Sequence, residues 1–237
     1  MNAASNRRIA LLAPMVSELR PLVKRGSLQS ETIGGVRVAT GRAGDNDVVA
    51  AKIGIGTERA ARATERVLDT GQFDRVIVVG IAGGVGSIPI AELVFPETVI
   101  DGPSGREYKP EPFDGIVPRG GLSTSDELHV DDEMLRSFTE RGVIALDMET
   151  SSVAEVCAQR DVPWSVVRSI SDIAGESPLD DSLLELAGPD GTPQIGPTLR
   201  YLATKPQQIP KLVGLARDSM RAANAAAAAA LRLSASL

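Results

Sequence analysis

The sequence predicts an α/β protein in which helices cover both faces of a largely buried sheet. Apolar runs that indicate strands alternate with segments of helical spacing along most of the 237 residues. The strand candidates are continuous apolar runs, which are typical of sheets buried on both faces. Aromatic residues make up only 3% of the chain, so Val, Ile, Leu and Ala must fill the core. Because the chain shows no internal repeat and no linker, we expect one domain over residues 1–237.

The first half of the chain is expected to begin with a short buried strand and to end in a glycine-rich turn. Thr57 is the expected N-cap of a helix that ends at Gly71. The most apolar run leads directly into the glycines of residues 80–86. The elements expected in order are a strand at 9–13, a helix at 15–25, strands at 33–40 and 47–55, a helix at 57–68 and a strand at 75–79.

The second half of the chain continues the alternation and closes with a long helix. Asp131 and Asp132 mark a helix start, because acidic side chains interact favourably with a helix N-terminus. Residues 171–205 are rich in Gly, Pro and acidic residues and are expected to be mostly loop. The alanine run at 225–230 can indicate a membrane or partner helix, but its high propensity favours a helix that closes the fold. The expected elements are strands at 92–100 and 116–124, a helix at 131–141, a strand at 143–146, a helix at 148–160, a strand at 164–170 and a helix at 207–233.

Composition excludes several classes of protein. Lys and Arg number 25 against 31 Asp and Glu, and the net charge of −6 argues against nucleic acid as a partner. Cys157 is the only cysteine and His129 the only histidine, so neither an intrachain disulfide nor a zinc site of the usual type is expected. No apolar run reaches about 18 residues, so no membrane span is expected. Because the N-terminus lacks a signal-peptide pattern, we expect a cytoplasmic protein.

Common nucleotide and hydrolase motifs are absent. Gly54 and Gly56 supply two glycines of a dinucleotide-binding fingerprint, but the third is missing. Neither a phosphate-binding GxxxxGK[ST] loop nor a GxSxG nucleophile elbow occurs. Cys157 lies on the apolar side of an expected helix and is interpreted as a small buried hydrophobe.

Polar residues instead gather where strands are expected to end. The glycines at 80–86 allow backbone N–H groups to approach a ligand, although they can equally form a simple turn. Asp147 and Glu149 lie where the chain passes from a strand into a helix. Asp147 can be explained as an acid at a helix N-terminus. A second acid at the same place needs another reason, so Glu149 indicates function.

The strand expected at 164–170 leads into a second such cluster. Alternation places Arg168, Ile170 and Asp172 on one side of the strand, with Ser169 and Ser171 on the other. An arginine and a carboxylate at the end of a buried strand are unfavourable unless they are paired or used, and a purely structural ion pair remains an alternative. Glu18 stands on the first turn of a helix after the first strand, where its alternative role is a surface partner of the helix dipole.

Five motifs together resemble the nucleoside phosphorylase/nucleosidase superfamily, and within it the 5′-methylthioadenosine/S-adenosylhomocysteine nucleosidases. The resemblance covers residues 8 to about 175, and the paired D-M-E and R-S-I-S-D motifs are its most specific part. It implies a three-layer α/β/α sandwich with a central mixed, partly barrel-like sheet, and a homodimer. The motifs are PMVSEL (14–19), KIGIGTERAA (52–61), VVGIAGGVG (78–86), LDMETSSVAEVC (146–157) and VVRSISDIAG (166–175).

The resemblance implies hydrolysis of a purine nucleoside through an oxocarbenium-like transition state, with no metal or cofactor. Asp172 matches the acid that protonates the purine N7, and Glu18 matches the acid that activates the attacking water. Glu149 matches the carboxylate that binds the ribose hydroxyls. These roles suit the chemistry, because the leaving base needs a proton, the sugar needs a nearby anion and water needs a base. The remaining expected substrate contacts are Met15, Ile81, Ala82, Gly83, His129, Val130, Met148, Arg168 and Ser171.

The chain departs from the family pattern at four places. Ile81 stands where a serine is frequent, so an anion or water held by that hydroxyl is lost. His129 stands where an aromatic residue is expected to stack on the base. Asp147 replaces a more frequent glutamate, and residues 101–115, which shape the pocket for the 5′ group, are not recognisably similar.

These departures leave alternatives open. A nucleosidase for another 5′-modified nucleoside such as futalosine, a phosphate-dependent phosphorylase and a non-catalytic nucleoside-binding protein are the candidates. Glu18 favours hydrolysis over phosphorolysis, because a carboxylate repels a phosphate dianion. The presence of all three acids argues against a mere binding protein.

Overall fold

The computed structural model describes residues 6–127, 131–175 and 209–237. Two of the expected base-binding residues, His129 and Val130, lie outside these ranges, as does most of the loop expected at 171–205. Within the described ranges no helix is long and apolar enough to cross a membrane.

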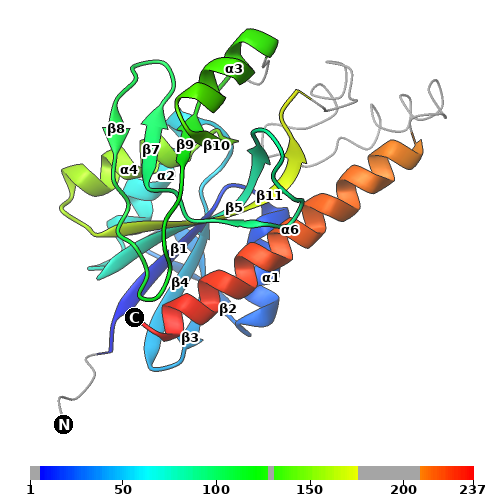
Figure 1. The fold of residues 1–237 in the computed structure, drawn as a ribbon. Coiled ribbons are helices and arrows are strands. Elements are labelled where there is room, and N and C mark those ends of the chain that lie inside the picture. Colours follow the sequence, from blue (N-terminus) through cyan, green and yellow to red (C-terminus); the bar gives the residue numbers. More distant parts are fainter. Residues whose placement is uncertain (1–5, 128–130, 176–208) are drawn as a thin grey trace.

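The architecture is a mixed eleven-stranded sheet with helices on both faces (Figure 1). Its centre is formed by parallel strands, in which β1 (Arg8–Ala13) lies between β4 (Asn46–Lys52) and β5 (Arg75–Gly84). Along its other edge β5 pairs in parallel with β11 (Trp164–Ile173). On the edge opposite β11, the C-terminal end of β5 pairs with β10 (Val143–Asp147) in antiparallel orientation. The strand path runs β2-β3-β4-β1-β5-β10-β9-β7-β8, with β11 and β6 branching from β5. The predicted α/β/α class is confirmed, and the sheet does not close into a barrel.

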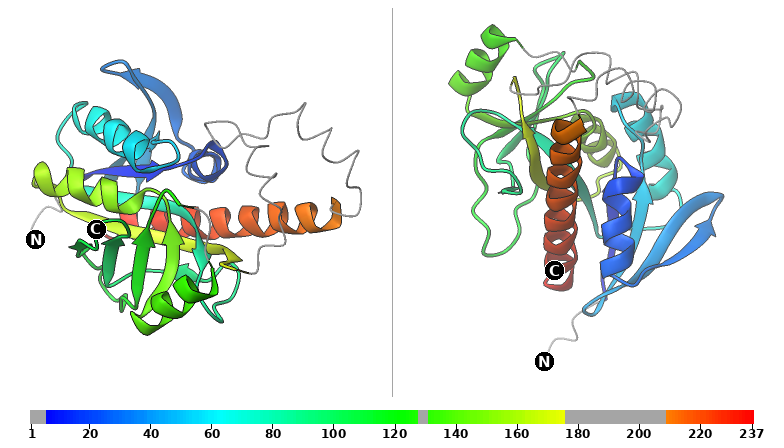
Figure 2. Two further views of the ribbon diagram at one scale, coloured as in Figure 1. Left: turned by 90° about the horizontal axis from the view of Figure 1, so that it is seen from above. Right: turned by 90° about the vertical axis from the view of Figure 1, so that its right-hand side faces the viewer.

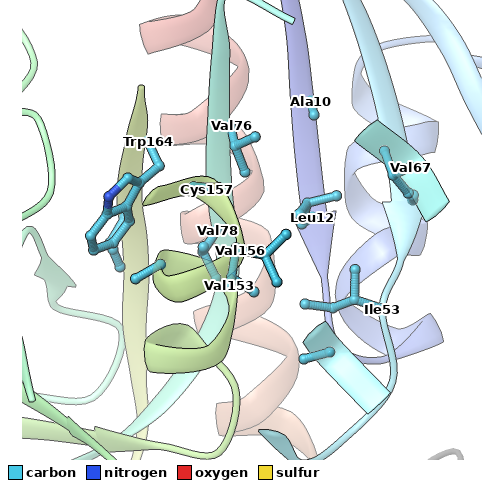
Figure 3. Packing of buried hydrophobic residues seen from close by; sticks show 14 of the residues in the cluster. Ala10, Leu12, Ile53, Val67, Val76, Val78, Val153, Val156, Cys157 and Trp164 are labelled. Atoms are coloured by element: carbon cyan, nitrogen blue, oxygen red, sulfur yellow. The ribbon is translucent and has the colours of Figure 1, made fainter. Parts of the chain in front are cut away.

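Two apolar layers explain the sandwich, because alternate residues of the central strands face opposite sides. Leu12, Val76 and Val78 pack towards α2 (Thr57–Leu68) and α4 (Thr150–Gln159), as Figure 3 shows. Ile77 and Val79 belong to the opposite layer, beneath α1 (Val16–Arg25) and α6 (Ile209–Ala235). Figure 2 shows the long helix α6 lying along the sheet and α2 and α4 on its other side. Because both layers are mostly aliphatic, with few buried aromatic residues, the low aromatic content is consistent with the packing.

The alanine run belongs to the helix that closes the fold. Four alanines of this run are completely buried against the sheet and α1, and their small side chains allow the helix to approach closely. The Asn46 side chain donates a hydrogen bond to the Ser234 carbonyl, 2.7 Å away, near the end of this helix. The prediction of a closing helix is therefore confirmed. The four residues are Ala226, Ala227, Ala229 and Ala230.

Several predicted boundaries are wrong for local reasons. The strand expected at 33–40 contains a hairpin turn, because Gly34 and Gly35 adopt φ of 55° and 78° between β2 (Gln29–Ile33) and β3 (Val36–Ala43). Helix α2 spans the expected residues 57–68, but its N-cap is Gly56 and not Thr57, and its C-cap is Asp69. The strand expected at 92–100 is divided into two short strands, and the strand expected at 116–124 begins only at residue 121. A short strand at 107–108, which pairs with residues 99–100, is not predicted from the sequence. The observed strands are β6 (Leu93–Val94), β7 (Thr98–Asp101), β8 (Glu107–Tyr108) and β9 (Gly121–Thr124).

The largest correction concerns the glycine-rich segment after residue 79. It was predicted to be a turn, but β5 continues as a strand through Gly84. Hydrogen-bonding partners on both sides explain the continuation: Gly80 pairs with Arg168 of β11, and Gly83 pairs with Leu146 of β10. The glycines therefore lengthen the central strand β5. Their pairing brings the polar ends of β10 and β11 beside it. The remaining helix α3 (Asp132–Glu140) has Asp131 as its N-cap, close to the prediction.

Candidate active site

Four charged side chains, from α1, the end of β10, the start of α4 and β11, are buried together beside β5. Arg168 is fully buried, and the side chains of Glu18, Asp147 and Glu149 are exposed by 1%, 2% and 6%. Burying a single charge is unfavourable, and burying three carboxylates around one arginine leaves excess negative charge in the interior. We call these four residues the carboxylate cluster.

Glu18 reaches the cluster from the first turn of α1. Its Oε2 accepts a hydrogen bond from the Met15 N–H at 2.7 Å, and its Oε1 accepts one from the Ile81 N–H at 2.8 Å. The first bond is the N-terminal capping arrangement expected of an acid at this helix position. The second bond ties α1 to the extended glycine segment of β5. Glu18 is thus buried rather than a surface partner of the helix dipole, and burial raises its pKa despite the attraction of Arg168.

Asp147 is the principal partner of Arg168. Arg168 donates from Nε to Asp147 Oδ2 at 3.0 Å and also from Nη2. The other carboxylate oxygen accepts from Thr124 Oγ1 at 2.7 Å and from the Thr150 N–H at 3.2 Å. Asp147 therefore serves the start of α4, as one interpretation of the sequence proposed, and also neutralises the buried arginine.

Glu149 connects the cluster to the N-terminus of α2. Its Oε2 lies 3.2 Å from Arg168 Nη2, and its Oε1 accepts a hydrogen bond from the Gly56 N–H at 3.2 Å. Burial raises the pKa of Glu149 to about 8, opposed by Arg168 and reinforced by the neighbouring Asp147 and Glu18. The charge of Glu149 therefore changes near neutral pH.

Arg168 carries the positive charge of the cluster. Burial alone lowers its pKa, but the three carboxylates outweigh burial and the pKa is raised. Its Nη1 lies 3.8 Å from Glu18 Oε1 and makes no hydrogen bond within the described residues. A buried donor without a partner is uncommon and indicates a place where a polar ligand atom can bind.

Gly80 makes room for this arrangement. A Cβ atom at Gly80 would lie 2.2 Å from Glu18 Oε1 and 2.5 Å from Arg168 Nη1. Any side chain at this position would therefore displace the carboxylate or the guanidinium. The glycine is needed here for close approach and not for a turn.

Asp172 lies farther along β11 and on the other face. A β-bulge separates Ile170, which pairs with Ala82, from Asp172, which pairs with the next residue, Gly83. Because neighbouring residues of a strand face opposite sides, the prediction that Asp172 shares a face with Arg168 is wrong. Ser171 Oγ donates a hydrogen bond to Asp172 Oδ1 at 2.5 Å.

The other expected contact residues have mixed positions. Met15 and Met148 are half-buried and adjoin Glu18 and Glu149 in the chain. Ile81, Ala82 and Gly83 lie in β5, and the Ile81 N–H contacts Glu18 as described. The structure therefore brings Glu18, Glu149 and Arg168 together, whereas Asp172 and Ser171 form a separate pair. In the described residues no group of three His, Cys, Asp or Glu side chains is placed to hold a metal ion.

Three parts of the site were missed from the sequence. The sequence does not predict the pairing of Asp147 with Arg168, the hydrogen bond from Thr124 to Asp147 or the hydrogen bond from the Gly56 N–H to Glu149. Thr124 ends β9, so the rule that polar residues at strand ends gather in one place would have found it. The Gly56 contact spans 93 residues and has no local signal.

Comparison with known proteins agrees with this architecture. A family model described as "Phosphorylase superfamily" matches residues 8–137 and 114–188. 5′-Methylthioadenosine/S-adenosylhomocysteine nucleosidases of Bacillus thuringiensis (strain Al Hakam) and Bacillus cereus (strain AH187) are each 28% identical over 203 residues, covering 71% of this chain and 87% of theirs.

Solved structures share the fold at low sequence identity. An S-adenosylhomocysteine nucleosidase from Streptococcus pyogenes has a TM-score of 0.74 at 17% identity, covering 100% of this chain and 99% of its own. A futalosine hydrolase of Helicobacter pylori has a TM-score of 0.72 at 16% identity, with coverage of 99% and 100%. Since the family model spans well over half of the sequence, the chain belongs to the phosphorylase superfamily.

Proposed function

We propose that this protein is a nucleosidase that hydrolyses the N-glycosidic bond of a purine nucleoside of the 5′-methylthioadenosine/S-adenosylhomocysteine type. The carboxylate cluster carries the proposal. Three buried carboxylates surround one arginine that retains a free buried donor, and that excess of negative charge suits a cationic sugar in the transition state. The nucleosidase relatives support the substrate class.

Glu18 is proposed to activate the attacking water. Two backbone N–H groups fix its carboxylate, so its orientation does not depend on substrate. The raised pKa makes it a stronger base than an exposed glutamate. The unbonded Arg168 Nη1 lies beside it and is suited to donating a hydrogen bond to the oxygen of that water. Glu18 would take one proton as the water oxygen bonds to the ribose C1′.

Glu149 is proposed to bind the ribose and to stabilise its positive charge, with Met148 packing on the sugar. In its ionised form Glu149 can accept hydrogen bonds from ribose hydroxyls, as the Gly56 N–H and Arg168 hold its carboxylate in place. The electrostatic benefit is largest as the oxocarbenium character develops, because the site is buried and poorly screened.

Asp172 is proposed to protonate N7 as the C1′–N9 bond breaks, so that the base leaves as a neutral purine. Its side chain is only partly buried, and the Ser171 hydroxyl holds one of its oxygens. Gly80 and Gly83 mark the positions of Arg168 and Asp172 along β5. The rise of about 3.3 Å per residue separates these positions by about 10 Å along the strand, so Asp172 stands apart from the groups proposed to act on the water and the sugar.

Hydrolysis is favoured over phosphorolysis by the charge of the cluster. A phosphorylase needs cationic groups that are free to bind a phosphate dianion. Arg168 is already engaged by three carboxylates, and Glu18 lies directly over Gly80. A phosphate at this position would have to compete with these carboxyl groups for Arg168 and would be repelled by those that are ionised.

A nucleoside panel tests this proposal. Release of free base from 5′-methylthioadenosine, S-adenosylhomocysteine, futalosine, adenosine and inosine is measured with purified protein in phosphate-free buffer. We expect release from the first two to exceed release from the others. Faster cleavage of futalosine would instead favour the second candidate, for which a solved futalosine hydrolase with the same fold is the supporting observation. Binding without cleavage of any nucleoside would show a non-catalytic binding protein.

We further propose that residues 1–237 act as one domain, in the cytoplasm, as a homodimer. Val213 and Met220 on α6 are 62% and 61% exposed, and exposed apolar side chains on one helix are consistent with a protein interface. Light scattering of the purified protein tests the dimer, and a monomeric mass at working concentration would contradict it.

A further inference from the structure

Within the Gly54–Thr57 segment, which resembles an incomplete nucleotide-binding fingerprint, only the Gly56 N–H has a role in the mechanism described above. Both glycines adopt left-handed backbone conformations, with φ of 88° at Gly54 and 92° at Gly56. Residues with side chains rarely adopt this conformation. The segment is therefore shaped to direct particular backbone N–H groups, and their partners indicate what it does.

The partners come from three segments around the carboxylate cluster. The Gly54 N–H donates to the Pro14 carbonyl at 3.1 Å, next to the turn that carries Glu18. The Gly56 N–H donates to Glu149 Oε1 at 3.2 Å. The Thr57 N–H donates to Asp126 Oδ1 at 2.8 Å, and Thr57 Oγ1 donates to Asp126 Oδ2 at 2.6 Å.

Asp126 replaces the side-chain cap that α2 lacks. The helix has Gly56 at its N-cap position, where no side chain can accept a hydrogen bond. An acid at this position satisfies an open N–H and interacts favourably with the helix dipole. Here the acid comes from the segment after β9, 69 residues away in the chain. Such a long-range cap fixes both the start of α2 and the N–H that precedes it.

We propose that Asp126 is a positioning residue for Glu149: by capping α2 at Thr57 it holds the Gly56 N–H on the Glu149 carboxylate. This inference rests on the proposed function, because it assigns Asp126 a part in the reaction through Glu149. Asp126 is exposed and is not placed in contact with substrate.

Loss of the Asp126 cap should change the pKa of Glu149. The groups that face Glu149 are Arg168, Asp147, Glu18 and the Gly56 N–H. Of these, only the Gly56 N–H depends on Asp126. This hydrogen bond lowers the pKa of Glu149, so weakening it raises that pKa further above its ordinary value. The ascending limb of the kcat–pH profile would then move to higher pH.

Asp126→Ala is the test variant and Asp126→Asn is the conservative one. An asparagine can accept from the Thr57 N–H and donate to Thr57 Oγ1, so it should restore most of the effect. Asp74→Ala is the matched control: Asp74 also accepts one backbone N–H, from Arg8 at 2.7 Å, but at the opposite end of the central strands. Exchange of the Gly56 amide hydrogen, measured by NMR, reports the contact without requiring activity.

We expect Asp126→Ala to lower kcat about tenfold at neutral pH, the value of one hydrogen bond to an ionised group. We also expect a shift of the ascending pH limb to higher pH and faster Gly56 exchange, with both effects largely reversed in Asp126→Asn and absent in Asp74→Ala. Unchanged Gly56 exchange and an unchanged pH limb in Asp126→Ala would overturn the proposal. A wild-type protein that cleaves no nucleoside would refute the proposed function instead, and Gly56 exchange would still decide whether Asp126 holds the contact.

Discussion

Two buried arginines on neighbouring strands show how a structural ion pair differs from a functional one. Arg75 begins β5 and pairs with Glu111, whose side chain is 52% exposed. Its other guanidinium nitrogen donates to Ser165 Oγ at 3.2 Å and to the Pro112 carbonyl at 3.4 Å. Arg75 thus has one counter-ion, nearby solvent and satisfied donors.

Arg168, in the middle of β11, has the opposite properties. It is completely buried, has three carboxylate partners and keeps one donor without a hydrogen bond in the described structure. Stability alone would favour a balanced pair or an apolar replacement. The excess of buried acids is therefore best explained by the demands of a cationic transition state. Under the proposed function, charge balance and satisfied donors distinguish the two arginines better than burial does.

The largest expected effect is from replacing each arginine with methionine. Arg168→Met leaves three buried carboxylates without a cation, and we expect a loss of about 3–5 kcal/mol in the free energy of unfolding, together with loss of turnover. Arg75→Met should destabilise much less and keep its activity. Urea unfolding and base release measure both quantities. Equal effects of the two substitutions on activity would remove the distinction drawn between the arginines.

Asp172→Asn comes next and separates chemistry from stability. The substitution removes the proposed proton donor but keeps the size of the side chain, so we expect turnover to fall by about 10²–10⁴-fold with little change in the melting temperature. Circular dichroism and base release on the same preparation provide the measurement. Retention of most activity would show that another group protonates the purine.

The third prediction uses the pH dependence of stability. The pKa of Glu149 is about 8 in the folded protein and near 4.5 in the unfolded chain, so the folded state binds more protons between these values. Stability therefore falls as pH rises from about 4.5 to 8. Glu149→Gln cannot lose this proton, and its melting temperature should rise relative to the wild type across that window. A difference between the two melting curves that is independent of pH would show that Glu149 is ionised throughout.

The smallest effect is expected at the structural pair. Glu111→Gln removes a counter-ion that is half exposed, and exposed pairs contribute about 0–1 kcal/mol. We expect a change of that size in the free energy of unfolding and no change in base release. A large loss of activity would mean that the Arg75 end of the strands also contributes to the reaction.

Much of the fold could be predicted because the signals are local. The aliphatic runs around Leu11, Ile77 and Val167 identify the central strands, and helical spacing identifies α1, α2 and α4. The positions of proline and glycine predict most helix and strand boundaries to within a few residues. The turn predicted after residue 79 failed because glycines that permit a turn also permit a close-packed strand, and only the pairing of β5 with its neighbours decides between them.

The sequence predicts which residues belong to the site but not which of them pair with one another. Glu18, Glu149 and Arg168 were each identified at strand or helix ends, and the structure brings them together. The partner of Arg168 could not be predicted, because Asp147 and Asp172 are both compatible with the sequence. One extra residue at Ser171 shifts the register of β11 and turns Asp172 to the other face. A bulge of this kind has no signature in the side chains.

Adenine release from 5′-methylthioadenosine with and without inorganic phosphate tests most directly the claim that the carboxylate cluster supports attack by water. We expect release in phosphate-free buffer at a rate that added phosphate does not increase, because Arg168 is already paired with three carboxyl groups. Free 5-methylthioribose should accompany the adenine in equal amounts. Release that occurs only with phosphate, with a sugar 1-phosphate as the product, would contradict this account of the cluster.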